Sequence, residues 1–207
     1  ELKRYNKSKK NLKPINFVDK DNSKITWERT QIQNIEKNKS LQFNEKSIQE
    51  CLYRPFTKIW GYTDEKFNSC VYQIPKIFPN KKEKNLVIIA PGTGNRNDFS
   101  TYISDKIPDL GFLSACYCFP LKIYSKIDEG LFKTENSYDA ITDDALRLFK
   151  TKLKLNSLKK EEIFYYIYGL FHSAEYRNNY KNNLNKEIPR IPISKNFKNF
   201  TEIGKKL

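Results

Sequence analysis

Residues 159–183 read KKEEIFYYIYGLFHSAEYRNNYKNN and carry the clearest periodicity in the chain. Acidic residues stand at the start of this stretch, and Arg177 and Lys181 stand near its end, an arrangement that suits the helix dipole. Apolar side chains recur at the spacing that places them on one face of an α-helix, at Ile163, Ile167, Leu170, Phe171 and Ala174. The stretch therefore predicts one long helix with a buried face.

Further helices are expected on both sides of this stretch. Residues 135–155 have the pattern of an amphipathic helix, and residues 197–207 are also helix-like. Residues 188–192, IPRIP, must be extended because two prolines forbid a helix. The C-terminal part of the chain is therefore predicted to be mainly helical.

The middle of the chain favours strands. Residues 85–90 form a short apolar run rich in β-branched side chains, which indicates a buried strand, and the tight turn 91–95 follows it. Extended structure is also expected in three further segments, residues 58–62, 71–78 and 112–124. Pro75 makes the second of these an edge strand or a bulge.

Two short helices are expected among these strands. Asn44 would cap the first, which Pro55 ends, and residues 100–107 would form the second, which Pro108 ends. Strands in no regular alternation, followed by late helices, argue for an α+β fold. We expect a small mixed β-sheet in the middle of the chain and long C-terminal helices.

The 207 residues suffice for one well-cored domain. Residues 1–40 are polar and rich in lysine, and we expect a basic arm or linker that packs on the domain, with a short helix around Ile32 and Ile35. Residues 41–195 would form the domain itself, and residues 196–207 a terminal helix that is truncated. Because the chain starts with a glutamate rather than a methionine, we expect a fragment of a longer protein.

Basic residues are in large excess. There are 38 Lys and Arg residues against 24 Asp and Glu residues, which gives a net charge of +14. Such an excess attracts polyanions, although a lysine-rich protein that is merely soluble has the same composition. With no signal peptide and no apolar run near twenty residues, we expect a cytoplasmic protein that binds no membrane.

No metal site or catalytic site is expected. The cysteines form no CxxC pair and His172 is the only histidine, so buried thiols are favoured over zinc at Cys51, Cys70, Cys116 and Cys118. Residues 87–94, VIIAPGTG, resemble the cofactor loop of a methylase or a phosphate loop. However, the Gly-Lys-Ser/Thr of a phosphate loop, the acidic ribose ligand and the Asn/Asp-Pro-Pro-aromatic motif of an amino-methylase are missing. His172 and Ser173 are adjacent helical positions that point apart, without a glycine elbow. We therefore expect a non-catalytic chain that binds no cofactor.

Basic, amide and aromatic side chains occur together at several places in the chain. Arg reads guanine, Asn reads adenine and Lys holds phosphates in protein–DNA complexes. A solvated rim over buried rings has the same composition, so the pattern alone leaves DNA contact open. The candidate DNA-binding residues, including two from the motifs described next, are Arg54, Lys58, Tyr62, Asn95, Arg96, Asn97, Lys122, Tyr124, Arg177 and Arg190.

Several segments in order resemble a known family. They are YRPF at 53–56, VYQIP at 71–75, FSTYISDKIPDL at 99–110 and CFPL at 118–121. The family's Leu-His-Ser-x-x-Tyr-Arg signature and the Pro-Arg-Ile-Pro that follows it stand here as FHSAEYR at 171–177 and IPRIP at 188–192. Together they are similar to the C-terminal specificity region of single-polypeptide Type I restriction–modification enzymes, the Type ISP family.

The resemblance implies a target recognition domain that reads a short asymmetric sequence of double-stranded DNA, largely through the major groove. It also implies a parent chain with a nuclease, a helicase-like ATPase and an N6-adenine DNA methyltransferase, which uses S-adenosylmethionine, ATP and Mg²⁺. The domain would contact the methyltransferase and helicase-like domains. The alternative is a non-catalytic scaffold domain of the same enzyme, with DNA read elsewhere. Specific binding of one duplex separates the two.

Overall fold

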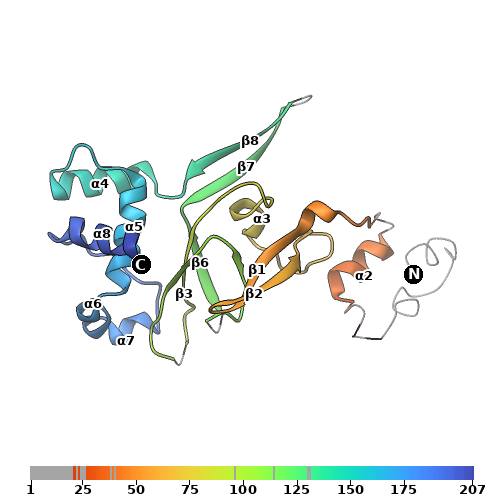
Figure 1. Cartoon of the computed structure of the whole chain (residues 1–207), viewed down its shortest axis with the longest axis horizontal. Helices are drawn as coiled ribbons and strands as arrows, with labels where there is room; N and C mark the ends of the chain where they lie inside the picture. Colours follow the sequence, from red (N-terminus) through yellow and green to blue (C-terminus); the bar gives the residue numbers. More distant parts are fainter. Residues whose placement is uncertain are drawn as a thin grey trace.

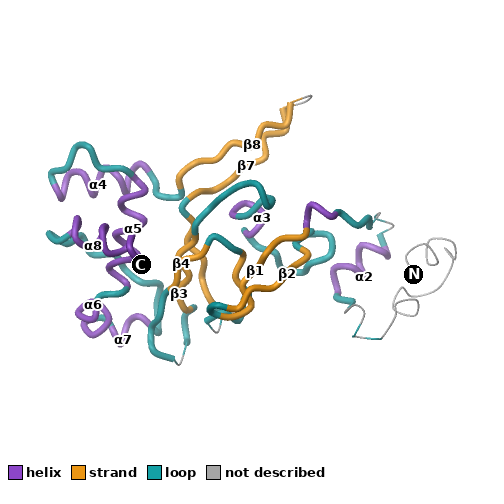
Figure 2. Tube along the Cα trace, in the orientation of Figure 1, coloured by secondary structure: helices purple, strands orange, loops and turns teal. Residues whose placement is uncertain are grey.

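The structure is a computed structural model that describes residues 21, 23, 27–37, 39, 41–95, 97–113, 115–129 and 132–207. The C-terminal helices gather at one end of the molecule, small sheets occupy its centre, and helix α2 lies at the other end (Figure 1). Helices and strands therefore occupy largely separate regions (Figure 2). This arrangement confirms the predicted α+β class.

The first sheet is mixed, as predicted. Its central strand β1 (Ile48–Arg54) pairs antiparallel with β2 (Thr57–Tyr62) and parallel with β5 (Ile107–Pro108). A separate two-stranded ribbon is formed by β7 (Lys122–Glu129) and β8 (Phe132–Asp139). The ribbon projects from the body of the molecule (Figure 1).

The second sheet contains the buried strand that the apolar run predicts. Strand β3 (Val87–Pro91) lies between β4 (Tyr102–Ser104) and β6 (Cys116–Pro120) and is antiparallel to both. Because side chains alternate along a strand, β3 contributes to two cores. Ile88 and Ala90 pack into the core of the C-terminal helices, whereas alternate β3 residues pack with α3 and Phe112.

The helices are short. Three precede β3 in the described chain: α2 (Arg29–Glu36), the 3-10 helix η2 (Glu45–Ser47) and α3 (Ile74–Ile77). Five follow the ribbon: α4 (Asp143–Leu153), α5 (Lys160–Phe171), α6 (Ala174–Asn179), α7 (Lys181–Leu184) and α8 (Phe197–Lys206). Helix α8 packs against α5, and its Phe197 joins the same core. The predicted terminal helix is therefore part of the packed structure.

The single helix predicted over residues 159–183 is interrupted. Helix α5 ends with His172 as its C-cap, and Ser173 is the N-cap of α6, where its hydroxyl accepts a hydrogen bond from Tyr176 N at 3.3 Å. A serine at this position satisfies a free N–H of the first turn and so begins a new helix. His172 and Ser173 thus lie at a helix junction rather than on one continuous helix.

Strand pairing overrides three other helix predictions. The capped turn at Asn44 exists but ends at Ser47, and the chain then enters β1. Residues 100–107 contain β4 and the start of β5, and residues 135–139 belong to β8 instead of the helix predicted from 135 onward. The opposite error occurs at residues 71–78, where Pro75 lies in the first turn of α3, a position at which proline is tolerated.

The helix expected near the N-terminus is confirmed as α2, and polar contacts tie it to the centre of the molecule. Asn34 Nδ2 donates to Lys66 O at 3.2 Å, and the hydroxyl of Ser69 donates to that of Thr30 at 2.8 Å. Residues 1–20 lie outside the described chain, so the division into arm, domain and terminal helix stays a prediction. Among the described residues, no helix has both the length and the apolar character needed to cross a membrane.

Candidate nucleic-acid interface

Three segments that are distant in sequence meet beside the two central sheets. They are the β1–β2 turn at residues 54–57, residues 92–95 and 97–98 after β3, and residues 109–113 and 115 before β6, and we call them the loop cluster. Arg54 Nη1 donates to Gly111 O at 3.1 Å and so joins the first segment to the third. Asn95 Nδ2 donates to Leu113 O at 3.4 Å and so joins the second to the third.

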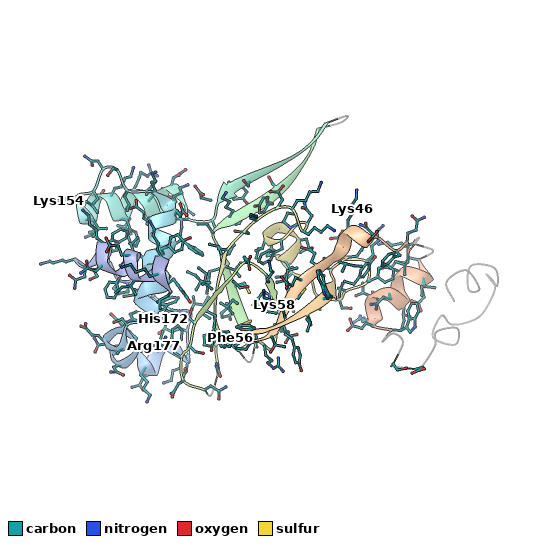
Figure 3. All side chains as sticks on the ribbon, in the orientation of Figure 1. Lys46, Phe56, Lys58, Lys154, His172 and Arg177 are labelled. Carbon is teal, nitrogen blue, oxygen red and sulfur yellow. The ribbon has the colours of Figure 1, made fainter. Side chains whose placement is uncertain are left out.

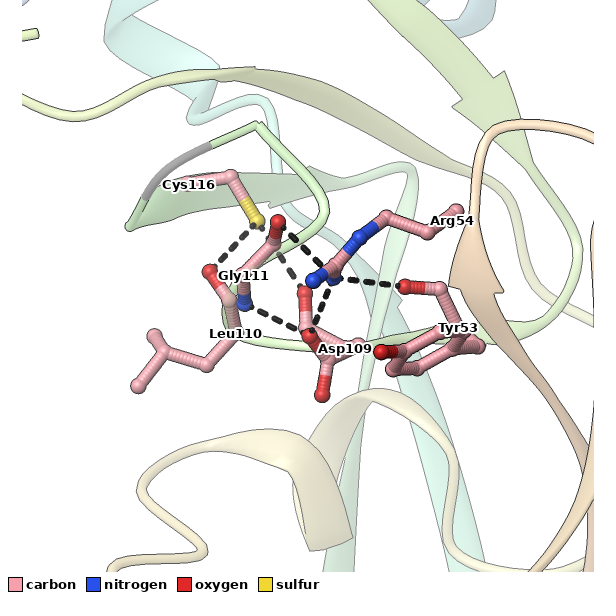
Figure 4. Close-up of polar contacts among 6 residues, drawn as sticks. All are labelled: Tyr53, Arg54, Asp109, Leu110, Gly111 and Cys116. Carbon is pink, nitrogen blue, oxygen red and sulfur yellow. Dashed lines mark hydrogen bonds and ion pairs between the residues drawn. The ribbon is translucent and has the colours of Figure 1, made fainter.

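Arg54 fastens the β1–β2 turn to the segment before β6 (Figure 4). Its Nη1 donates to Asp109 Oδ1 at 3.2 Å and to Tyr53 O at 3.1 Å, in addition to Gly111 O. Asp109 Oδ1 also accepts from Gly111 N at 2.8 Å, and the Arg54 guanidinium lies 4.4 Å above the Tyr53 ring. About half of the Arg54 side chain remains exposed, 47%. Arg54 therefore shapes the cluster and remains accessible.

Asn95 and Asn97 lie together in the segment after β3. Asn95 Oδ1 accepts from Asn97 N at 3.0 Å, which closes a local turn, while Gly94, with φ of +82°, donates its N–H to Asn185 O at 2.8 Å. The Asn95 amide is thus used within the protein, whereas Asn97 is exposed. Arg96, which stands between them, lies outside the described residues.

Lys58 lies on β2, close to the cluster. Its side chain is 63% exposed, and its ammonium group is 3.8 Å from Glu50 Oε1. Tyr62 is at the far end of the same strand, where its ring stacks on Phe43 and its hydroxyl accepts from Asn44 N at 2.9 Å. Tyr62 therefore supports the start of β1 rather than the loop cluster.

The remaining candidates stand elsewhere in the fold. Lys122 is exposed at the start of β7, but Tyr124 is buried and its hydroxyl donates to Lys84 O at 2.8 Å. Arg177 Nε donates to Phe171 O at 2.7 Å at the α5–α6 junction. Tyr124 is thus buried in the structure, and Arg177 is half-buried; contact of Arg177 with DNA stays a prediction.

The two C-terminal motifs of the sequence form one structural unit. Tyr176 is buried and its hydroxyl donates to Arg190 O at 2.8 Å, which ties α6 to the extended IPRIP segment. Burial raises the pKa of Tyr176 to about 12. The Arg190 side chain points outward and pairs with Glu187 at 3.0 Å. Arg190 is therefore accessible but distant in sequence from the loop cluster.

The neutral form of the His172 ring is favoured at the α5–α6 junction. Burial lowers its pKa, and the charge of Arg177, whose Nη2 lies 3.4 Å from His172 Nδ1, lowers it further. The Ser173 hydroxyl caps α6 by accepting from Tyr176 N. Among the described residues, no group of three or more His, Cys, Asp and Glu side chains is arranged to hold a metal ion.

The cysteines differ in their surroundings. Cys51, Cys116 and Cys118 are half-buried, whereas Cys70 is exposed, so the expectation of buried thiols is wrong for Cys70. A hydrogen bond from Cys118 lowers the pKa of Cys116 to about 7, and the same contact raises the pKa of Cys118. Cys116 is the most acidic thiol with a resolved shift, although the charge of the Asp109 carboxylate opposes the lowering of its pKa.

Sequence reasoning missed several members of the loop cluster. Asp109 and Gly111 could not be recognised because their role depends on a partner more than fifty residues away, Arg54. Phe56 and Tyr117 are exposed aromatic side chains of the cluster or its edge. The YRPF motif at 53–56 contained the available signal for Phe56, since a proline before it indicates a turn.

Residues 2–207 match the family model of the Type ISP C-terminal specificity domain. The chain belongs to this family. The resemblance predicted from the ordered motifs is therefore confirmed over nearly the whole chain. Among proteins of curated function, no significant match is found.

Three solved structures of proteins bound to DNA or to a DNA mimic share this fold. A cryo-electron microscopy structure of a DrdV–DNA complex is 30% identical over 99% of this chain, with a TM-score of 0.84. The ATP-dependent Type ISP restriction–modification enzyme LlaBIII bound to DNA is also 30% identical over 99% of this chain, with a TM-score of 0.82. A nuclease-deletion mutant of the Type ISP enzyme LlaGI, in complex with a DNA substrate mimic, has the same identity and coverage and a TM-score of 0.75. This chain spans only 20%, 13% and 18% of those three chains, respectively.

Proposed function

We propose that this specificity domain recognises a short sequence of double-stranded DNA as the target recognition domain of a Type ISP restriction–modification enzyme. The observation that carries the proposal is the family match over residues 2–207, together with relatives of the same fold that were solved on DNA. The net charge of +14 supports it, because contacts to phosphates supply much of the affinity for DNA.

The loop cluster is the surface that fits this role best. Loops that a rigid scaffold positions are the usual place for binding residues, and β3, which is buried along its whole length, anchors one of these loops. Arg54, Lys58 and Asn97 offer exposed donors there, the side chains that read guanine, hold phosphates and read adenine. Contact of DNA with each of these residues is part of the proposal.

The proposal extends to the parent chain. This domain would act within a longer polypeptide that carries a nuclease, a helicase-like ATPase and an N6-adenine DNA methyltransferase, which use Mg²⁺, ATP and S-adenosylmethionine. The domain itself would be non-catalytic and would contact the methyltransferase and helicase-like domains. Its short span of the DrdV, LlaBIII and LlaGI chains is consistent with this arrangement.

Selection from a pool of random duplexes tests the proposal. The 207-residue chain is incubated with the pool and excess unrelated competitor DNA, and bound duplexes are amplified and sequenced. We expect one short sequence to be enriched. The affinity for it should fall as salt rises, and a plot of log K against log salt concentration should have a slope of about −0.9 for each phosphate neutralised. A chain that binds DNA without enriching any sequence would instead be the scaffold domain, and the proposal would be wrong.

A further inference from the structure

Phe56 is the most exposed of the large apolar side chains that the structure describes, at 91%. It stands on a two-residue turn, since Arg54 pairs with Thr57 across the β1–β2 hairpin. The φ angle of Phe56 is +67°, in the left-handed region. Figure 3 labels Phe56 and Lys58 on this hairpin, in the centre of the molecule.

The fold alone does not favour phenylalanine at this position. A residue with positive φ after a proline is the pattern of a type II turn, for which Gly or Asn is preferred. A bulky side chain is strained there, and an exposed ring gains little from the hydrophobic effect. The ring contact found for Phe56 is an edge contact with Tyr102, with centroids 6.2 Å apart, and it leaves the ring open to solvent.

The turn that carries Phe56 is held firmly. Arg54, two residues earlier, is bound to Asp109 and Gly111, and the strand register shifts between Leu52 and Arg54, which marks a bulge. Bulges re-aim the side chains that follow them and are frequent beside functional sites. The ring is therefore presented at a defined place in the loop cluster, close to the candidate readers.

We propose that Phe56 is a wedge that inserts its ring between two base pairs of the recognised duplex and unstacks them. The inference rests on the proposed function and deepens it by assigning the residue that deforms the DNA. Apolar side chains, Phe among them, are used in this way by proteins that kink DNA. Sequence-dependent resistance to unstacking would then contribute to specificity at a step that no polar group reads.

Duplex DNA fits this ring better than another protein surface does. Lys58, two residues after Phe56, has a side chain that is 63% exposed, and lysine is depleted in protein–protein interfaces. A single ring on a narrow turn also matches the gap at one base step. Docking of the ring on a protein partner becomes an outcome of the test.

The test compares Phe56→Gly with the wild-type chain on the duplex selected from the random pool. Glycine relieves the positive φ, so we expect a melting temperature higher by about 2–4 °C. Loss of the ring should weaken binding of the selected duplex by about 5- to 150-fold, the effect of removing one base–aromatic stack. The fluorescent base 2-aminopurine is then placed at each purine of the selected sequence in turn. Binding of the wild-type chain should raise the 2-aminopurine fluorescence at one base step, because the base is unstacked there, and binding of Phe56→Gly should not.

Two further variants separate a wedge from other roles. Phe56→Leu keeps an apolar wedge and should retain most of the fluorescence increase. Tyr72→Gly is the matched control, because Tyr72 is also an exposed aromatic residue, at 76%, with a φ of +46°. Tyr72 lies outside the β1–β2 turn, in the segment between β2 and α3. Tyr72→Gly should therefore raise the melting temperature without changing affinity or fluorescence.

Each other result overturns the inference in a distinct way. A lower melting temperature of Phe56→Gly would mean that the ring supports the fold through Tyr102. Wild-type affinity of Phe56→Gly for the selected duplex would leave the proposed function intact and assign the ring to a protein partner. Weaker binding with an unchanged fluorescence increase would mean a groove contact without unstacking. If no sequence is enriched from the pool, the proposed function fails and the inference fails with it.

Discussion

Gly169 in α5 and Gly204 in α8 form a direct backbone contact between the two helices. A Cβ atom added at Gly204 would lie 2.9 Å from Gly169 N and 2.0 Å from Tyr165 O, and one added at Gly169 would lie 2.1 Å from Phe200 O. Real Cβ contacts are not this short, so neither position accepts a side chain while the helices stay in place. The close approach brings Phe197 of α8 onto Tyr166 of α5, with ring centroids 4.7 Å apart.

We expect Gly169→Ala to destabilise the fold by about 1–3 kcal/mol or more, because the obstructing atoms belong to the backbone and the helices must separate. For a domain of this size each kcal/mol lowers the melting temperature by roughly 2–4 °C. Gly94→Ala is the control, because a Cβ there meets nothing within 4 Å and only the φ of +82° opposes it. A melting temperature of Gly169→Ala above that of Gly94→Ala would contradict this account.

The sequence predicted the parts of the fold in which local pattern and packing agree. Residues 86–90 are apolar along their whole length, and β3 is buried along its whole length. The apolar face predicted in residues 159–171 is buried in the structure, where this stretch forms α5. Residues 132–139, FKTENSYD, have no apolar alternation, so nothing local identified them as β8, whose strand depends on pairing with β7.

The candidate site was predicted less well, for a physical reason. Arg54 and Asn97 have residue types that suit DNA, and the loop cluster includes both. The contacts that build the cluster, however, join Arg54 to Asp109 and Asn95 to Leu113. Such pairs depend on how three separate segments meet in the fold, and no local pattern in the sequence indicates them.

Asn85 is a buried polar residue whose structural role sequence reasoning missed. Its Nδ2 donates to Ile77 O at 2.9 Å and to Lys122 O at 2.8 Å, and its Oδ1 accepts from Lys122 N at 3.0 Å. Each buried group left without a partner costs about 1–3 kcal/mol. We therefore expect Asn85→Ala to lower the free energy of unfolding by roughly 3 kcal/mol or more in urea titrations. Asn97→Ala, at an exposed position, should change it by less than about 0.5 kcal/mol.

The lowered pKa of His172 predicts a pH dependence of stability. In the folded protein, burial and Arg177 disfavour the protonated ring, while in the unfolded chain the ring has the ordinary histidine pKa of about 6.5. The unfolded state therefore binds a proton that the folded state does not, and stability falls as the pH drops below that value. His172 is the only histidine. His172→Gln should therefore weaken the pH dependence of the urea midpoint between about pH 7 and pH 5.5. An unchanged slope would contradict the burial of the ring.

The pair of Arg54 and Asp109 gives the sharpest test of how the loop cluster works. Both side chains are partly exposed, at 47% and 42%, so Arg54→Ala should cost less than about 1 kcal/mol of stability. Its effect on DNA should be larger, because the Arg54 contacts hold the segment at residues 109–111 in place. Specific binding is measured for Arg54→Ala, Asp109→Asn and the double variant, each on the selected duplex and on random DNA.

If Arg54 acts by positioning this segment, each single variant removes the same ion pair, and the double variant should lose no more affinity than the worse single one. The affinity for random DNA should then change little. If Arg54 instead reads a guanine, its removal should cost about 1–3 kcal/mol on the selected duplex and relax the preference at one base pair. The losses from Arg54→Ala and Asp109→Asn would then add in the double variant. Because Asp109 is also bonded to Gly111 N, Asp109→Asn keeps one acceptor there, and additivity would rule out the positioning role without unfolding the segment.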